Sequence, residues 1–170
     1  MSTAAVVLAA GGGRRYGMPK ALVEYEGSLL VERAVRTARA ACDVVLVVLG
    51  AQAVDVWRTA DLSGATVLAN KDWETGMASS LRTGLDGLRG FPGTVDAALI
   101  TLVDMPGMTP EALRAVAAER QSDKIYLRAD GSIPYARIMQ VMGALNAAGF
   151  NNIVLVTDTG GPRMDAGVEG

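Results

Sequence analysis

Residues 6–22 read VVLAAGGGRRYGMPKAL, an apolar run that ends in three consecutive glycines and is followed by two arginines and a Pro-Lys pair. The run is apolar throughout instead of alternating, which is typical of a strand covered on both faces. A glycine-rich loop after a strand presents backbone N–H groups to an anion, because glycine allows positive φ and lets ligand oxygens come close. The stretch therefore predicts a buried strand followed by an anion-binding loop.

The rest of the chain repeats this strand pattern and alternates it with helices. Further apolar runs lie at 44–49, 66–69, 97–103, 125–127 and 153–156. Apolar stripes with a helical period lie at 30–38, 77–88, 113–117 and 135–145. Thr109 is expected to cap the third helix with Pro110 at its first position, and Gly149 to end the fourth. This alternation predicts an α/β fold, a Rossmann-like three-layer αβα arrangement with a mostly parallel sheet that binds ligands beyond the carboxyl ends of its strands.

Composition limits the classes of function. The 170 residues suit one globular domain, and the net charge of -2 offers no basic surplus that would draw the whole molecule to nucleic acid or an anionic membrane. The chain has no histidine, which excludes Ser-His-Asp, Cys-His and His-ligated zinc chemistry. Its single cysteine, Cys42, is expected to be a small buried hydrophobe. The first ten residues lack the layout of a signal peptide or a membrane span, which predicts a cytoplasmic protein.

Two familiar nucleotide motifs do not match the glycine loop. A dinucleotide fingerprint would need a glycine where Tyr16 stands and an acidic residue at the end of the second strand, which is followed by Gly50. A Walker A loop would need a hydroxyl residue after its lysine, but Ala21 follows Lys20. The residues alone leave two interpretations, a glycine turn with solvated arginines or a triphosphate site. The cations available to such a site are Arg14, Arg15 and Lys20.

Three segments resemble the MobA/MocA-like nucleotidyltransferases. LAAGGGRRYGMPKAL at 8–22 resembles their signature loop, NKDWETGMASSLRTGL at 70–85 their middle segment, and ITLVDMPGMTPEAL at 100–113 their metal-binding strand end. The motifs follow the family's order, and the resemblance covers about residues 2–120. It implies a nucleotide-diphospho-sugar-transferase-like fold. It also implies Mg²⁺-dependent transfer of CMP or GMP from CTP or GTP to a phosphorylated acceptor, such as a molybdopterin-type cofactor, with release of pyrophosphate.

The resemblance also assigns the residues of the site. Arg14 and Lys20 would hold the triphosphate, and Asp104 would bind Mg²⁺ and act with them in catalysis. Nucleotidyl transfer needs alignment on the α-phosphorus and neutralisation of the departing pyrophosphate, which two cations and Mg²⁺ can supply. Without the resemblance, Asp104 could be a turn or helix-capping aspartate, and the segment around Trp73 a capped helix packed by an aromatic ring. The nucleotide-binding residues would be Leu8, Ala9, Ala10, Gly11, Gly12, Gly13, Asn70, Gly76 and Ser79.

The resemblance ends near Gln121. Residues 123–159, DKIYLRADGSIPYARIMQVMGALNAAGFNNIVLVTDT, instead resemble the periplasmic domain of TolR/ExbD proteins. This division predicts a nucleotide-binding part at 1–121 and a β-α-β tail at 122–170, which could extend the same parallel sheet and could self-associate through its edge. Two alternatives to an active transferase remain: a nucleotide-binding but inactive chimera, and a TolR/ExbD-like interaction module without catalysis.

Overall fold

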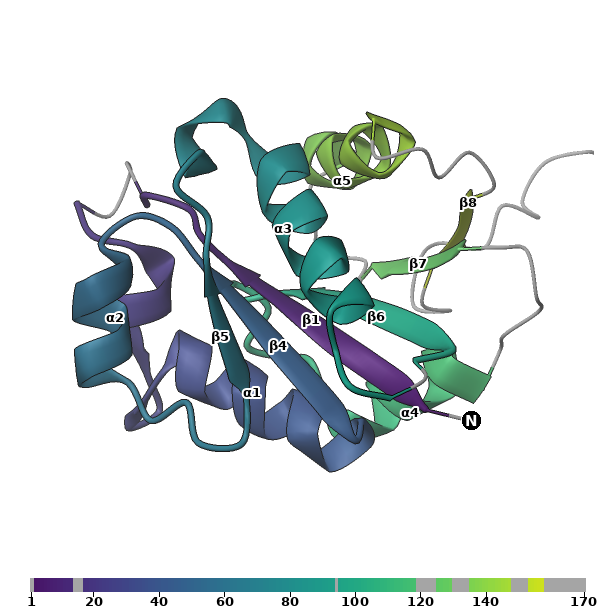
Figure 1. Ribbon diagram of the computed structural model, residues 1–170, viewed down its shortest axis with the longest axis horizontal. Helices are drawn as coiled ribbons and strands as arrows, with labels where there is room; N and C mark the ends of the chain where they lie inside the picture. The colour runs from purple at the N-terminus through teal and green to yellow at the C-terminus, as the bar shows by residue number, and fades with distance from the viewer. Residues whose placement is uncertain are drawn as a thin grey trace, which may run out of the picture.

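A parallel sheet of four strands forms the centre of the molecule (Figure 1). The computed structural model describes residues 2–13, 17–93, 95–118, 125–129, 135–147 and 153–157. The strand order is β5-β4-β1-β6, and every pairing is parallel. Valine, leucine and alanine fill the two central strands, whose residues are almost all buried, as expected for strands covered on both faces. The four strands are β1 (Thr3–Ala9), β4 (Val44–Leu49), β5 (Thr66–Ala69) and β6 (Ala97–Leu102).

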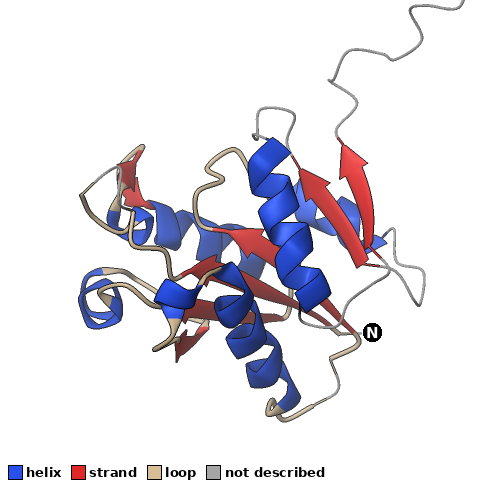
Figure 2. Cartoon of the chain, turned by 90° about the horizontal axis from the view of Figure 1, so that it is seen from above, coloured by secondary structure: helices blue, strands red, loops and turns tan. Residues whose placement is uncertain are grey.

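Helices cover both faces of this sheet, which confirms the predicted three-layer α/β fold (Figures 1 and 2). α1 (Leu30–Ala41) and α4 (Pro110–Ala118) pack together on one face, and α3 (Met77–Arg89) packs on the other. The side chains of β1 alternate between the two layers, because successive residues of a strand point to opposite faces. Ala5, Val7 and Ala9 join the core beneath α1, whereas Ala4, Val6 and Leu8 join the core beneath α3.

Two local predictions agree with the structure. The Ala112 backbone N–H donates to Thr109 Oγ1 at 3.2 Å, so Thr109 caps α4 and Pro110 is its first residue. Cys42 is a buried free cysteine in the core beneath α1, and burial together with the neighbouring charge of Asp43 raises the pKa of its thiol. Within the described ranges, no helix has the length and apolar character needed to cross a membrane.

The structure also contains short elements that the apolar pattern does not predict. α2 (Ala53–Thr59) buries Val56 but exposes Val54 and Trp57, so its sequence carries no clean apolar stripe. The other elements are two or three residues long, which is too short to display a period. They are the hairpin strands β2 (Glu24–Tyr25) and β3 (Ser28–Leu29) and the 3-10 helices η1 (Lys20–Leu22) and η2 (Trp73–Thr75).

The tail follows the predicted β-α-β order, but its described strands do not extend the main sheet. β7 (Ile125–Ala129) and β8 (Ile153–Thr157) pair in parallel as a separate two-stranded sheet (Figures 1 and 2). α5 (Tyr135–Ala147) instead packs on α3. Gln121 and Gly149 lie outside the described residues. The residues at the α3–α5 contact include Leu81, Val141, Ala144 and Leu145.

Close packing of α3 on the sheet gives a prediction for Gly84. A Cβ there would lie 2.5 Å from Val6 Cγ1 and 3.3 Å from Val48 Cγ2, so an added methyl group would push the helix off the strands. We expect Gly84→Ala to lower the free energy of unfolding by about 1 to 2 kcal/mol in urea titrations, although alanine favours helix formation. Gly143→Ala is the matched control, because nothing lies within 4 Å of its Cβ. It should instead stabilise by about 0.5 to 1 kcal/mol, and equal stabilisation by both variants would contradict the packing argument.

Candidate active site

A cavity of about 1050 Å³ lies at the carboxyl ends of the parallel strands. One wall comes from the loop after β1, a second from the segment that joins β5 to α3, and a third from the end of β6. α5 closes a further side with Ala136, Gln140, Gly143 and Ala144. Parallel α/β sheets bind their ligands at this position, because loops from neighbouring strands converge there.

The glycine loop after β1 lines the cavity along residues 10–13. Gly13 has a φ of +60°, and a Cβ there would overlap the carbonyl oxygen of Met18, so both conformation and space require glycine. A Cβ at Gly12 would lie 3.0 Å from Trp73 Cζ3, which shows how closely the indole approaches the loop. The loop therefore presents its backbone to the cavity.

The structure places most of the loop residues that the sequence assigns to nucleotide binding on the cavity wall. Leu8, Ala10, Gly11, Gly12 and Gly13 line the cavity. The side chain of Ala9 does not reach it, because strand alternation turns Ala9 into the core beneath α1, where it is 2% exposed. Arg14, together with Arg15 and Tyr16, lies outside the described residues.

Lys20 and Asp104 meet on this wall. Lys20 Nζ donates to Asp104 Oδ2 at 2.7 Å across 84 residues of sequence, and their side chains are 31% and 16% exposed. β1 and β6 are neighbours in parallel register, with Leu8 opposite Leu102, so the residues that follow them emerge at the same edge. The two groups assigned to triphosphate and metal binding are therefore side by side.

Asn70 stabilises the segment between β5 and α3 through buried hydrogen bonds. It is 6% exposed, and its Nδ2 donates to Ser79 Oγ at 2.8 Å and to Ser80 Oγ at 2.9 Å. Its Oδ1 accepts from the Asp72 backbone N–H at 3.0 Å. Both amide hydrogens are used internally, so Asn70 ties the end of β5 to the first turn of α3. Of the three middle-segment residues assigned to the nucleotide, Gly76 lines the cavity, whereas Asn70 and Ser79 hold it in place.

Sequence reasoning left Trp73 undecided and did not find the contribution of α5. Trp73 lines the cavity beside Gly12. The sequence feature that could have assigned Trp73 to the site is an aromatic residue in a turn just before a helix. Gln140 of α5 carried no comparable signal. Its place depends on how α5 packs against α3, and an apolar pattern does not specify the partner of a helix.

The donor set at Asp104 fits one kind of divalent metal site. Among the residues that the structure describes, no group of three or more acidic, cysteine or histidine side chains could hold a metal ion. Mg²⁺ is commonly bound through one or two carboxylates, several waters and the phosphates of a substrate. The site therefore fits Mg²⁺ that arrives with a triphosphate, and it does not fit a metal held by the described side chains alone.

Known proteins with similar sequences and folds identify the family. The model of the MobA-like NTP transferase domain matches residues 5–141. The nicotine blue oxidoreductase of Paenarthrobacter nicotinovorans is 35% identical over 137 residues, which are 79% of this chain and 65% of that protein. The chain thus spans less than two thirds of the length of that curated relative.

Solved structures share the fold. Rv0371c from Mycobacterium tuberculosis superposes with a TM-score of 0.71 at 22% identity, over 92% of this chain and 89% of that chain. The manganese complex of Rv0371c gives a TM-score of 0.67 at 22% identity over the same shares of the two chains. A nucleotidyl transferase from Methanothermobacter thermautotrophicus gives 0.63 at 27% identity, over 75% of this chain and 62% of that chain.

The family match also bears on the tail. It continues past Gln121 without a break as far as Val141 in α5, so it covers β7 and half of the helix that closes the cavity. The resemblance of 123–159 to TolR/ExbD proteins therefore receives no support. The family expected from the resemblance of the glycine loop and of the end of β6 is thus confirmed: the chain belongs to the family of MobA-like NTP transferase domains.

Proposed function

We propose that the chain is a Mg²⁺-dependent nucleotidyltransferase that transfers CMP or GMP from CTP or GTP to a phosphorylated acceptor, such as a molybdopterin-type cofactor. The observation that carries this proposal is the meeting of Lys20 and Asp104 at 2.7 Å on the cavity that the glycine loop lines. A metal-bound triphosphate needs a cation, a carboxylate and backbone donors together. The described residues offer these three groups around one cavity.

Each group would have a separate task in the transfer. An oxygen of the acceptor phosphate attacks the α-phosphorus, and the bond from that phosphorus to the bridging oxygen breaks as pyrophosphate leaves. Backbone N–H groups of the glycine loop would orient the phosphates, and Lys20 would neutralise charge on the departing pyrophosphate. Asp104 would hold Mg²⁺, which supplies further neutralisation when bound. By the family resemblance, Arg14 would add a second cation.

Two further observations support this reaction class. The manganese complex of Rv0371c supports a divalent metal in this fold, and Mn²⁺ is bound by the same oxygen ligands as Mg²⁺. α5 lines the cavity opposite the loop with small side chains and one amide, which leaves room for an acceptor beside the triphosphate. The proposal places the enzyme in the cytoplasm, where triphosphates and Mg²⁺ are available.

The name of the similar Paenarthrobacter protein favours a second candidate, an oxidoreductase. Such an enzyme would need a nicotinamide or flavin dinucleotide, whose pyrophosphate would lie against the glycine loop. The loop departs from the dinucleotide fingerprint at Tyr16, and β4 is followed by Gly50 instead of an acidic residue. The oxidoreductase is therefore the second candidate, and binding of a dinucleotide instead of a triphosphate would distinguish it.

Thermal unfolding with a panel of nucleotides separates the candidates. With Mg²⁺ present, we expect CTP or GTP to raise the Tm, since a ligand at a hundredfold excess over its Kd stabilises by about 2.7 kcal/mol. A pyrophosphate-release assay with phosphorylated acceptors then distinguishes an active transferase from an inactive nucleotide-binding domain. A shift with NADH, NADPH or FAD and none with any triphosphate would overturn the transferase proposal in favour of the oxidoreductase.

Lys20→Met tests the contact between this lysine and the triphosphate. Loss of a charged hydrogen bond should weaken Mg²⁺–CTP binding about ten- to a hundredfold in calorimetry. Lys71→Met is the control, because Lys71 is exposed and does not line the cavity. An unchanged CTP affinity in Lys20→Met would move the phosphate site away from this lysine.

Asp104→Asn tests the metal ligand directly. The amide keeps the shape of the side chain but removes its charge, so the affinity for Mn²⁺ in the presence of CTP should fall about ten- to a hundredfold. Binding of metal-free CTP should become tighter, because a carboxylate no longer faces the phosphates. If the variant retains full metal-dependent activity, Asp104 is not the metal ligand.

A further inference from the structure

We propose that Arg33 of α1 is a positioning residue for Asp104. It lies outside the nucleotide site and acts on the turn that follows β6, which carries Asp104. By holding this turn against α1, it fixes the direction in which the carboxylate enters the cavity. The inference rests on the proposed function, because it takes Asp104 as the ligand of a metal-bound triphosphate.

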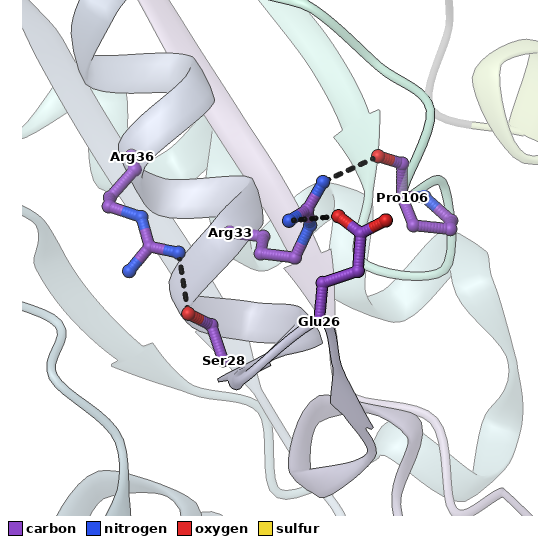
Figure 3. A network of polar contacts seen from close by, with 5 residues as sticks. All are labelled: Glu26, Ser28, Arg33, Arg36 and Pro106. Atoms are coloured by element: carbon purple, nitrogen blue, oxygen red, sulfur yellow. Dashed lines mark hydrogen bonds and ion pairs between the residues drawn. The ribbon is translucent and has the colours of Figure 1, made fainter.

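The guanidinium of Arg33 joins two loops that are distant in sequence (Figure 3). One terminal nitrogen donates to the carbonyl oxygen of Pro106 at 3.3 Å, and the other donates to Glu26 Oε2 at 3.3 Å. The same group lies over the Tyr25 ring, 4.9 Å from its centroid. Arg33 thereby links the β2–β3 hairpin to a residue two positions after Asp104.

Three hydrogen bonds surround the turn after β6. The Val103 N–H donates to the Leu8 carbonyl at 3.1 Å, which continues the strand pairing up to the residue before Asp104. Beyond that point, the Met108 N–H donates to the Met105 carbonyl at 3.1 Å within the turn itself. The bond from Arg33 to Pro106 then anchors the turn from outside, across 73 residues of sequence.

The hydrogen bonds of Arg33 require an arginine side chain at this position. Its side chain is 29% exposed, but Nε is buried and has no hydrogen-bond partner in the part of the chain that the structure describes. A buried unpaired N–H opposes folding, because it loses its hydrogen bond to water and gains none in the folded chain. The two terminal nitrogens thus bond to Pro106 and Glu26, while the Nε–H group is left without a hydrogen bond. A lysine has a single ammonium group and cannot reproduce this forked arrangement.

The position of the turn matters because Mg²⁺ tolerates little displacement of its ligands. Mg²⁺ requires near-octahedral oxygen ligands at about 2.0–2.1 Å. Residues that orient a metal ligand therefore influence affinity without contacting the metal, and their loss commonly weakens binding about 10- to 100-fold. Arg33 would exert this effect through the backbone of 104–106.

Arg36 offers a matched control on the same helix. It also contacts the hairpin, because its terminal nitrogen donates to Ser28 Oγ at 2.9 Å (Figure 3). In Figure 3, Arg36 points away from Pro106. Arg33→Met and Arg36→Met therefore both remove a cation that contacts the hairpin, but Arg33→Met alone removes the anchor of the turn that carries Asp104.

The experiment measures Mn²⁺ binding by electron paramagnetic resonance with saturating CTP, metal-free CTP binding by calorimetry, and the Tm. We expect Arg33→Met to weaken Mn²⁺ binding about tenfold and to leave the affinity for metal-free CTP unchanged. Arg36→Met should leave both affinities at the wild-type value. Arg33→Lys retains the charge and stem, serves if Arg33→Met does not fold, and should weaken Mn²⁺ binding to a smaller extent.

Combination with Asp104→Asn shows whether Arg33 acts through the carboxylate. In that background, Arg33→Met should cause no further loss of Mn²⁺ affinity, since the ligand that it positions is already removed. An equal additional loss in the Asp104→Asn background, or the same loss in Arg36→Met, would overturn the inference. Failure of the wild-type chain to bind Mn²⁺ with CTP would instead overturn the proposed function on which the inference rests.

Discussion

The parallel register between β1 and β6 is the constraint on which the site depends. Thr3 lies opposite Ala97 and Leu8 opposite Leu102, so the carboxyl ends of the two strands lie within one residue of each other. A slip of one residue would turn the core side chains of one strand to the wrong face, and the buried layers on both sides exclude it. The same register delivers Lys20 and Asp104 to one wall, although the loops that carry them belong to different strands.

The sequence predicts two kinds of feature well. These are elements whose apolar residues follow a regular pattern and positions where only one residue type fits. Continuous apolar runs indicated the strands of the sheet, because a strand covered on both faces admits few polar residues. The glycine loop was recognised for a similar reason, because a side chain at Gly13 would overlap the carbonyl oxygen of Met18. The role of Lys20 in triphosphate binding stays a prediction that the family resemblance makes. Asp104 needed the family resemblance as well, because an aspartate at a strand end is also a common turn residue.

The parts that sequence predicted poorly depend on contacts between elements. Ala9 was assigned to the nucleotide with its neighbours, but strand alternation turns it toward α1. Asn70 was predicted to contact the nucleotide, and that contact stays a prediction; the sequence did not show that its amide donates to two serine hydroxyls. The tail was expected at the sheet edge, and α5 packs on α3 instead. A linear pattern shows that a side chain is polar or apolar, and it does not show which neighbour receives it.

The attachment of α5 has a consequence for how this fold diversifies. The side of the cavity that α5 closes is joined to the body through α3, by Val141, Ala144 and Leu145 against Leu81. Substitutions on the exposed turns of α5 can thus reshape that side while the strand register and the glycine loop stay unchanged. Such a separation allows related proteins to exchange one reaction partner for another within a constant scaffold.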